Sequence, residues 1–137
     1  MAKIKILFVE DDPGNRLFLA DYAEIVAKEN IDLAISTDSQ NRDLRSYDKP
    51  LEIDVLVLDF NLIGITGLQI LKRIRKQDNP NRHIPVIFIP GNSPDIGSAE
   101  YREKLFREMN VIGIFEKPYV INTVIGRTKD WHRKNQG

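Results

Sequence analysis

The chain has 137 residues, no cysteine, and twenty Lys and Arg against twenty Asp and Glu, so its formal net charge at pH 7 is zero. This balance gives no general attraction to nucleic acid or anionic lipid. The lack of cysteine excludes a disulfide framework, a thiolate nucleophile and a zinc–thiolate site. The length predicts a single domain over 1–137 with a frayed tail over 132–137. No apolar run approaches about 20 residues, so we expect no membrane span and a soluble, cytoplasmic protein.

An acidic turn separates the first predicted strand from the first predicted helix. The apolar run from Ile4 to Val9 leads directly into Glu10, Asp11 and Asp12. Pro13 suits the first helical turn and Asp12 can cap it, so a helix should begin there and reach about Asn30. Apolar positions at helical spacing predict its buried face, namely Leu17, Phe18, Tyr22, Ile25 and Val26. Residues 31–35 alternate apolar and polar, which is typical of a half-buried edge strand.

The central strand is predicted at Val55 to Leu58, four consecutive branched aliphatic residues that end at Asp59. Such a run is typical of a strand buried on both faces in the middle of a parallel sheet. The polar stretch 36–50 before it predicts only a short helix near 41–47. In open α/β sheets, ligands bind outside the carboxyl ends of the strands, so Asp59 stands where chemistry is expected.

Strands and helices continue to alternate after Asp59. The pattern predicts helices around 68–74 and 101–109 and from Pro118, with strands at 84–89 and 111–115. Five alternations predict a parallel sheet with right-handed crossovers. We therefore expect an α/β, flavodoxin-like fold with strand order 2-1-3-4-5 and five helices on both faces of the sheet.

This topology predicts that charged residues meet at one edge of the sheet. The first strand delivers Glu10 and Asp11, the third delivers Asp59, and Lys117 follows the fifth. Crowded carboxylates repel one another and are relieved by protonation or by a cation. Oxygen ligands without His or Cys select a hard ion such as Mg²⁺, to which the backbone carbonyl of Asn61 could contribute.

Three segments carry a resemblance to the receiver domains of two-component response regulators. They are the acidic turn 9–16, the stretch 57–62 with Gly64 and Gly67, and the turn 116–119. The resemblance spans essentially the whole chain. It implies that Asp59 takes a phosphoryl group from a phosphohistidine. It also implies Mg²⁺ held by Asp11, Asp59 and the Asn61 carbonyl, with Glu10 acting through water and Lys117 pairing with phosphorylated Asp59.

Two positions depart from that family. Pro90 stands where receivers usually carry Thr or Ser, and Ile114 stands where they commonly carry Tyr or Phe. Phe115, one residue further along the strand, should point to the opposite face. Proline offers neither a hydroxyl nor an N–H, and isoleucine has no aromatic ring. The hydroxyl and the ring that receivers usually use to respond to phosphorylation are therefore both missing. We expect chemistry at Asp59 with an atypical output: a phosphoryl sink, a relay intermediate, or a partner contact without loop closure.

The main alternative is a pseudo-receiver, a protein–protein interaction module that is not phosphorylated. A phosphatase of the haloacid-dehalogenase type is disfavoured because Asn61 stands where its acid would be, and no glycine-rich nucleotide motif follows the first strand. We expect no enzyme, no cofactor besides Mg²⁺ and no attached effector domain. The expected partners are a sensor histidine kinase or histidine phosphotransfer protein, a downstream protein, and a second copy bound through the fourth helix, fifth strand and fifth helix.

Overall fold

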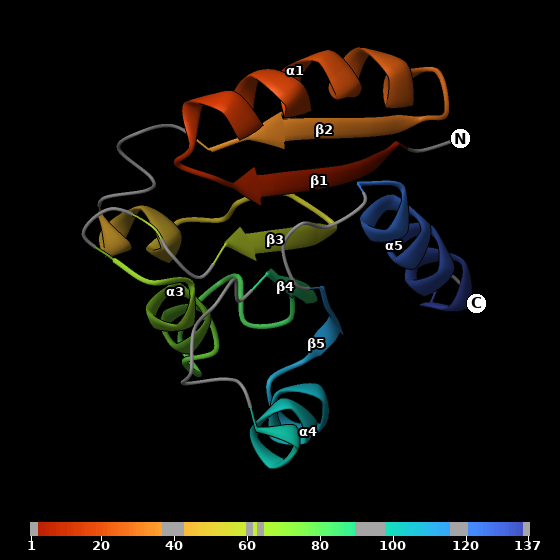
Figure 1. Cartoon of the computed structure of the whole chain (residues 1–137). Helices are drawn as coiled ribbons and strands as arrows, with labels where there is room; N and C mark the ends of the chain where they lie inside the picture. The colour runs from red at the N-terminus through yellow and green to blue at the C-terminus, as the bar shows by residue number, and fades with distance from the viewer. Residues whose placement is uncertain are drawn as a thin grey trace.

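The computed structural model describes residues 3–36, 43–59, 62, 65–89, 98–115 and 121–135. Its centre is a five-stranded sheet in the order β2-β1-β3-β4-β5, in which every neighbouring pair is parallel (Figure 1). The strands are β1 (Ile4–Val9), β2 (Ile31–Ile35), β3 (Val55–Asp59), β4 (Val86–Ile89) and β5 (Val111–Ile114). The predicted fold class and strand order are confirmed.

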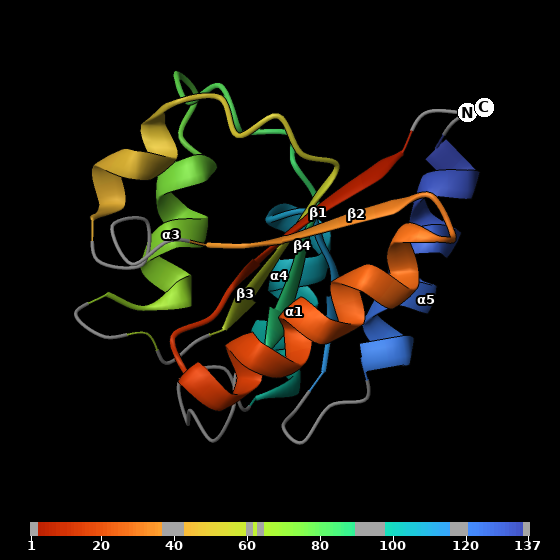
Figure 2. The same cartoon turned by 90° about the horizontal axis from the view of Figure 1, so that it is seen from above.

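Helices cover both faces of this sheet (Figures 1 and 2). The α-helices are α1 (Pro13–Ala27), α3 (Gly67–Ile74), α4 (Ala99–Glu108) and α5 (Ile121–Asn135). Side chains of α1 and α5 share one core cluster with one face of the sheet, and side chains of α3 and α4 share a second cluster with the other. The expectation of five helices is wrong for the described residues, which contain four α-helices and a short 3₁₀ helix, η1 (Leu44–Asp48).

Local side-chain hydrogen bonds explain why η1 is a 3₁₀ turn. The Asp43 carboxylate accepts from the backbone N–H of Arg45 at 3.0 Å, and the Ser46 hydroxyl donates to the Asp43 carbonyl at 2.6 Å. Short polar side chains that bond to nearby backbone compete with α-helical hydrogen bonds. The segment therefore closes one tight turn instead of a longer helix.

β3 is buried on both faces, as its sequence predicts. Val55, Leu56, Val57 and Leu58 are each 0% exposed. Val55 and Val57 belong to the cluster shared with α1 and α5, whereas Leu56 and Leu58 belong to the other. This alternation is what a two-residue period imposes on a strand between two layers of helices.

α1 begins as predicted but buries only part of the predicted face. Pro13 occupies its first turn and the Asp12 side chain caps it by accepting from the backbone N–H of Asn15. The helix ends at Ala27, and Asn30 closes the following turn with φ 63°. The fully buried residues are Leu19 and Val26, whereas three members of the predicted face are exposed: Leu17 71%, Phe18 55% and Ile25 58%.

α5 extends further than predicted. It continues to Asn135, so residues 132–135 are helical and the frayed tail does not begin at 132; residues 136–137 lie outside the described part. Trp131 packs against the core, and the Asn135 amide donates to its carbonyl oxygen at 2.8 Å. Within the described ranges, no helix is both long and apolar enough to cross a membrane.

Candidate functional site

Strand register places the acidic turn beside Asp59. β1 and β3 are hydrogen-bonded neighbours, and Val9 pairs with Leu58. The next residue of each strand is an acid, Glu10 after Val9 and Asp59 after Leu58. Because the strands are parallel, these residues lie at the same edge of the sheet, which confirms the predicted meeting of the first and third strand ends.

Two of the acids at this edge are almost completely buried. Glu10 is 1% exposed and Asp59 is 3% exposed, while Asp11 is half-buried. Burial of a carboxylate is unfavourable unless hydrogen bonds or cations compensate its charge.

The start of α1 holds the Glu10 carboxylate. Its Oε1 accepts from the backbone N–H of Asp12 and from the Asn15 side-chain amide, both at 3.2 Å. The N-terminus of a helix also carries a partial positive charge that favours nearby anions. On the other side, the backbone N–H of Glu10 donates to the Ser36 hydroxyl at 3.4 Å, which ties the end of β1 to the end of β2. Glu10 is thus fixed by its own turn.

Several predicted site residues lie outside the described part of the chain. They are Asn61, Pro90 and Lys117, so their predicted roles stay predictions. Ile114 is described and packs, half-buried, against the cluster shared with α3 and α4. Phe115 packs against the opposite cluster, so the two neighbours lie on opposite faces, as predicted.

The donor chemistry at this edge fits magnesium better than a softer metal. Among the described residues, no group of three or more His, Cys, Asp or Glu side chains is arranged to hold a metal ion. Mg²⁺ typically needs only one or two carboxylates and keeps several waters. Asp11 and Asp59, on neighbouring strand ends, can supply that number of oxygen ligands, whereas Glu10 is engaged by α1.

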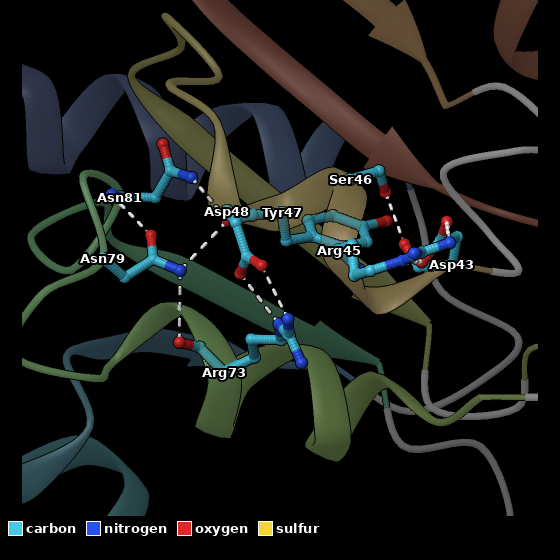
Figure 3. Close-up of polar contacts among 8 residues, drawn as sticks. All are labelled: Asp43, Arg45, Ser46, Tyr47, Asp48, Arg73, Asn79 and Asn81. Carbon is cyan, nitrogen blue, oxygen red and sulfur yellow. Dashed lines mark hydrogen bonds and ion pairs between the residues drawn. The ribbon is translucent and has the colours of Figure 1, made fainter.

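Tyr47 of η1, which shares a buried cluster with Val9 and Leu58, is a residue that sequence reasoning did not single out. It is 0% exposed, and its backbone oxygen accepts from the side-chain amides of Asn79 at 3.0 Å and Asn81 at 2.9 Å (Figure 3). Its hydroxyl has no hydrogen-bond partner among the described residues. Burial, and then the negative charge of Asp11, raise the pKa of Tyr47 far above its usual value. One tyrosine in a polar stretch gave no periodic signal that could reveal this placement.

Known structures with this fold are numerous and share little sequence with the chain. A response regulator receiver protein from Pseudomonas putida is 18% identical, with 95% of this chain and 98% of that chain covered at a TM-score of 0.70. The chemotaxis protein CheY4 from Vibrio cholerae is 19% identical, with 94% and 98% covered at 0.67.

A third structure carries a metal. It is the receiver domain of a sensor histidine kinase from Pseudomonas aeruginosa PAO1, with a magnesium ion coordinated in its active-site cleft. It is 22% identical, with 95% of this chain and 98% of that chain covered at a TM-score of 0.66. No curated protein sequence matches the chain significantly. The response regulator receiver domain, as a sequence family, matches residues 6–128, and the chain therefore belongs to that family.

Proposed function

We propose that Asp59 accepts a phosphoryl group from a phosphohistidine on a partner protein in a two-component phosphorelay. The observation that supports this most directly is the buried Asp59 carboxylate at the end of β3, one strand away from Glu10 and Asp11. In the transfer, a carboxylate oxygen of Asp59 forms a bond to phosphorus as the phosphorus–nitrogen bond of the phosphohistidine breaks. The imidazole leaves with the nitrogen electron pair and is neutral once it carries one proton.

The proposed cofactor is Mg²⁺. Asp11 and Asp59 would hold it with the Asn61 carbonyl, and Glu10 would act through water. When bound, the ion neutralises charge on the phosphoryl oxygens. Lys117 would contribute a second positive charge to the phosphorylated Asp59. These residues would position and stabilise a phosphoryl group on the protein itself. We therefore propose a phosphoacceptor and not an enzyme.

The proposed phosphodonor is a sensor histidine kinase or a histidine phosphotransfer protein in the cytoplasm. It must cover the surface next to Asp59 to deliver its phosphohistidine. α1 starts at the acidic turn and exposes Leu17, Phe18 and Ile25, and the Phe18 ring stacks on Tyr22 with centroids 6.1 Å apart. Exposed apolar side chains in such a group are typical of a protein contact, which supports docking of the donor along this helix.

The proposed output does not depend on the usual loop closure. Ile114 has an aliphatic side chain packed against the core, and it carries no hydroxyl or ring edge that could follow a phosphoryl group. Pro90 lacks the hydroxyl that would bind that group. We therefore assign the domain to a phosphoryl sink, a relay step or a constitutive contact with a downstream protein. A second copy, bound through α4, β5 and α5, is the further partner that we propose.

A small acyl-phosphate donor tests phosphoryl acceptance without a cognate kinase. The protein is incubated with acetyl phosphate and Mg²⁺, and intact mass is measured. We expect one added phosphoryl group that disappears with EDTA and in Asp59→Ala. Asp32→Asn, an exposed acid on β2, is the matched control and should be labelled like the wild type. No adduct on the wild type, or an adduct that persists in Asp59→Ala, contradicts the proposal.

The pseudo-receiver alternative is supported by Ile114 and by the way α1 engages Glu10. Thermal unfolding with and without Mg²⁺ separates the two functions. A phosphoacceptor should gain about 1.4 kcal/mol of stability when Mg²⁺ is tenfold above its dissociation constant, because the ion binds only the folded state. This gain should vanish in Asp11→Ala. Indifference of the wild type to millimolar Mg²⁺ would favour the pseudo-receiver.

A further inference from the structure

Among the described residues, the Tyr47 hydroxyl is the one buried side-chain nitrogen or oxygen that forms no hydrogen bond. Buried polar groups in folded proteins are nearly always hydrogen-bonded, because an unmade bond leaves the desolvation of the group uncompensated. Tyr47 is 0% exposed, so bulk water does not reach its side chain. A phenylalanine at this position would fill the same space without an uncompensated hydroxyl.

The rest of the residue is held firmly. Its carbonyl accepts from the amides of Asn79 and Asn81, and these two residues are themselves 5% and 2% exposed. Figure 3 shows the ring extending from the turn on the side away from Asn79 and Asn81. These hydrogen bonds fix the backbone from which the ring and its hydroxyl extend.

The ring packs in the core cluster that lies between the sheet and the helices α3 and α4. It belongs to the same buried cluster as Val9 and Leu58, the residues that immediately precede Glu10 and Asp59. Asp11 is the charged group whose field acts on the phenol and, after burial, raises the pKa of Tyr47. The phenol therefore stays protonated at neutral pH and can act only as a neutral donor or acceptor.

We propose that Tyr47 is a positioning residue of the phosphoacceptor site, whose hydroxyl donates a hydrogen bond to the Asp11 carboxylate when Mg²⁺ is bound. This inference rests on the proposed function. A carboxylate has two oxygens, so one can bind the ion while the other accepts from Tyr47. Carboxylates that bind metals are generally held by such hydrogen bonds, which orient them toward the ion.

The test is the substitution Tyr47→Phe, which removes only the hydroxyl. Mg²⁺ binding is measured by titration calorimetry on the full chain. We expect the dissociation constant to rise about tenfold, the lower end of what loss of such a supporting hydrogen bond produces. Tyr101→Phe is the matched control, since Tyr101 is a half-buried tyrosine on α4 that packs against the same cluster. Its Mg²⁺ affinity should equal that of the wild type.

A second readout follows the hydroxyl itself. The protein is labelled with ¹³C at the tyrosine ring carbon that bears the oxygen, and the Tyr47 signal is identified by its loss in Tyr47→Phe. We expect this signal to shift on addition of Mg²⁺ in the wild type and to stay unchanged in Asp11→Ala. A purely structural tyrosine would not respond to the ion.

The outcomes separate this inference from the proposed function. If the wild type binds Mg²⁺ and Tyr47→Phe binds it equally well, the positioning role is wrong and the proposed function stands. If the ¹³C signal of Tyr47 does not move with Mg²⁺, the positioning role is likewise wrong. If the wild type binds no Mg²⁺ at all, both fall. Far-UV circular dichroism and cooperative unfolding of Tyr47→Phe establish that the variant is folded.

Discussion

Arg73 of α3 forms a bidentate ion pair with Asp48 of η1 through two parallel hydrogen bonds. Nε lies 2.8 Å from Oδ1 and Nη2 lies 2.6 Å from Oδ2 (Figure 3). The planar guanidinium matches a carboxylate in this fork geometry, which a lysine cannot reproduce. The pair joins α3 to the turn that carries Tyr47, and the hydrogen bond from Arg73 lowers the pKa of Asp48.

The contribution of this pair to stability should depend on pH. Because the pKa of Asp48 is lower in the folded state than in the unfolded chain, its stabilising effect is complete above the unfolded pKa and is lost as the pH falls through the folded one. Arg73→Gln should therefore melt below the wild type at pH 7, and the two melting temperatures should converge as the pH falls below about 4. A difference that stays constant from pH 7 to pH 2.5 would contradict this.

Tyr47→Phe should leave the metal-free protein as stable as the wild type or more stable. The substitution removes an unpartnered buried hydroxyl, whose desolvation costs about 1–3 kcal/mol, and keeps the ring. Tyr47→Ala should instead lose about 3–5 kcal/mol, because it leaves a cavity in the cluster. Urea unfolding without Mg²⁺ measures both. A large loss in Tyr47→Phe would show that the hydroxyl is already bonded in the metal-free protein.

Arg75 should be one of the costliest cations to remove. Its guanidinium donates to the carbonyl oxygens of Met109 at 2.7 Å and Ile84 at 2.6 Å, and burial lowers its pKa to about 10, so it remains charged at pH 7. Arg75→Ala should lower the free energy of unfolding by about 3 kcal/mol, since hydrogen bonds from a charged group are worth about 1.5–3 kcal/mol each.

Arg75→Lys should recover only part of this loss, because an ammonium cannot reach the carbonyls as a fork. Arg107, paired with Glu103 on the exposed side of α4, is the control. Arg107→Ala should change stability by less than about 0.5 kcal/mol. Equal losses at the two positions in urea unfolding would overturn the role given to Arg75.

Gly113 leaves room for the ring of Phe115. A methyl group there would lie 3.0 Å from Cε2 and 3.2 Å from Cζ of Phe115. Gly113→Ala should destabilise the protein by about 1–2 kcal/mol through this overlap, and the cost should shrink in a Phe115→Leu background. Gly126→Ala is the matched control: nothing lies within 4 Å of its added carbon in α5, so it should stabilise the helix by up to about 1 kcal/mol.

Much of the fold could be predicted because its signals are local. The branched aliphatic run of β3 predicts a strand buried on both faces, and the alternation in β2 predicts a half-buried strand. The turn Asp12–Pro13 marks the start of α1. The position of Asp59 beside the acidic turn then follows from strand order alone. These features need no knowledge of what the neighbouring elements contain.

The buried face of α1 could not be predicted in the same way. Leu17, Phe18 and Ile25 lie at helical spacing, and so do Leu19 and Val26. Both stripes are apolar, and only the approach of the helix to the sheet decides which one is covered. Of the predicted face, Val26 is buried and Tyr22 packs against the core, whereas Leu17, Phe18 and Ile25 are exposed.

Tyr47 was out of reach for a different reason. Its carbonyl is held by residues more than thirty positions later in the chain, and no pattern in residues 43–48 predicts these contacts. The roles of Asn61, Pro90 and Lys117 lie outside the described residues and stay predictions.

The two amides that hold the Tyr47 carbonyl also set an order of assembly. Asn79 and Asn81 lie 32 and 34 residues beyond Tyr47, on the far side of β3 and α3. A nascent chain that has left the ribosome only as far as β3 lacks both donors, so its 3₁₀ turn cannot yet be locked. The Tyr47 carbonyl can thus acquire these two hydrogen bonds only after α3 and the turn that follows it have been synthesised.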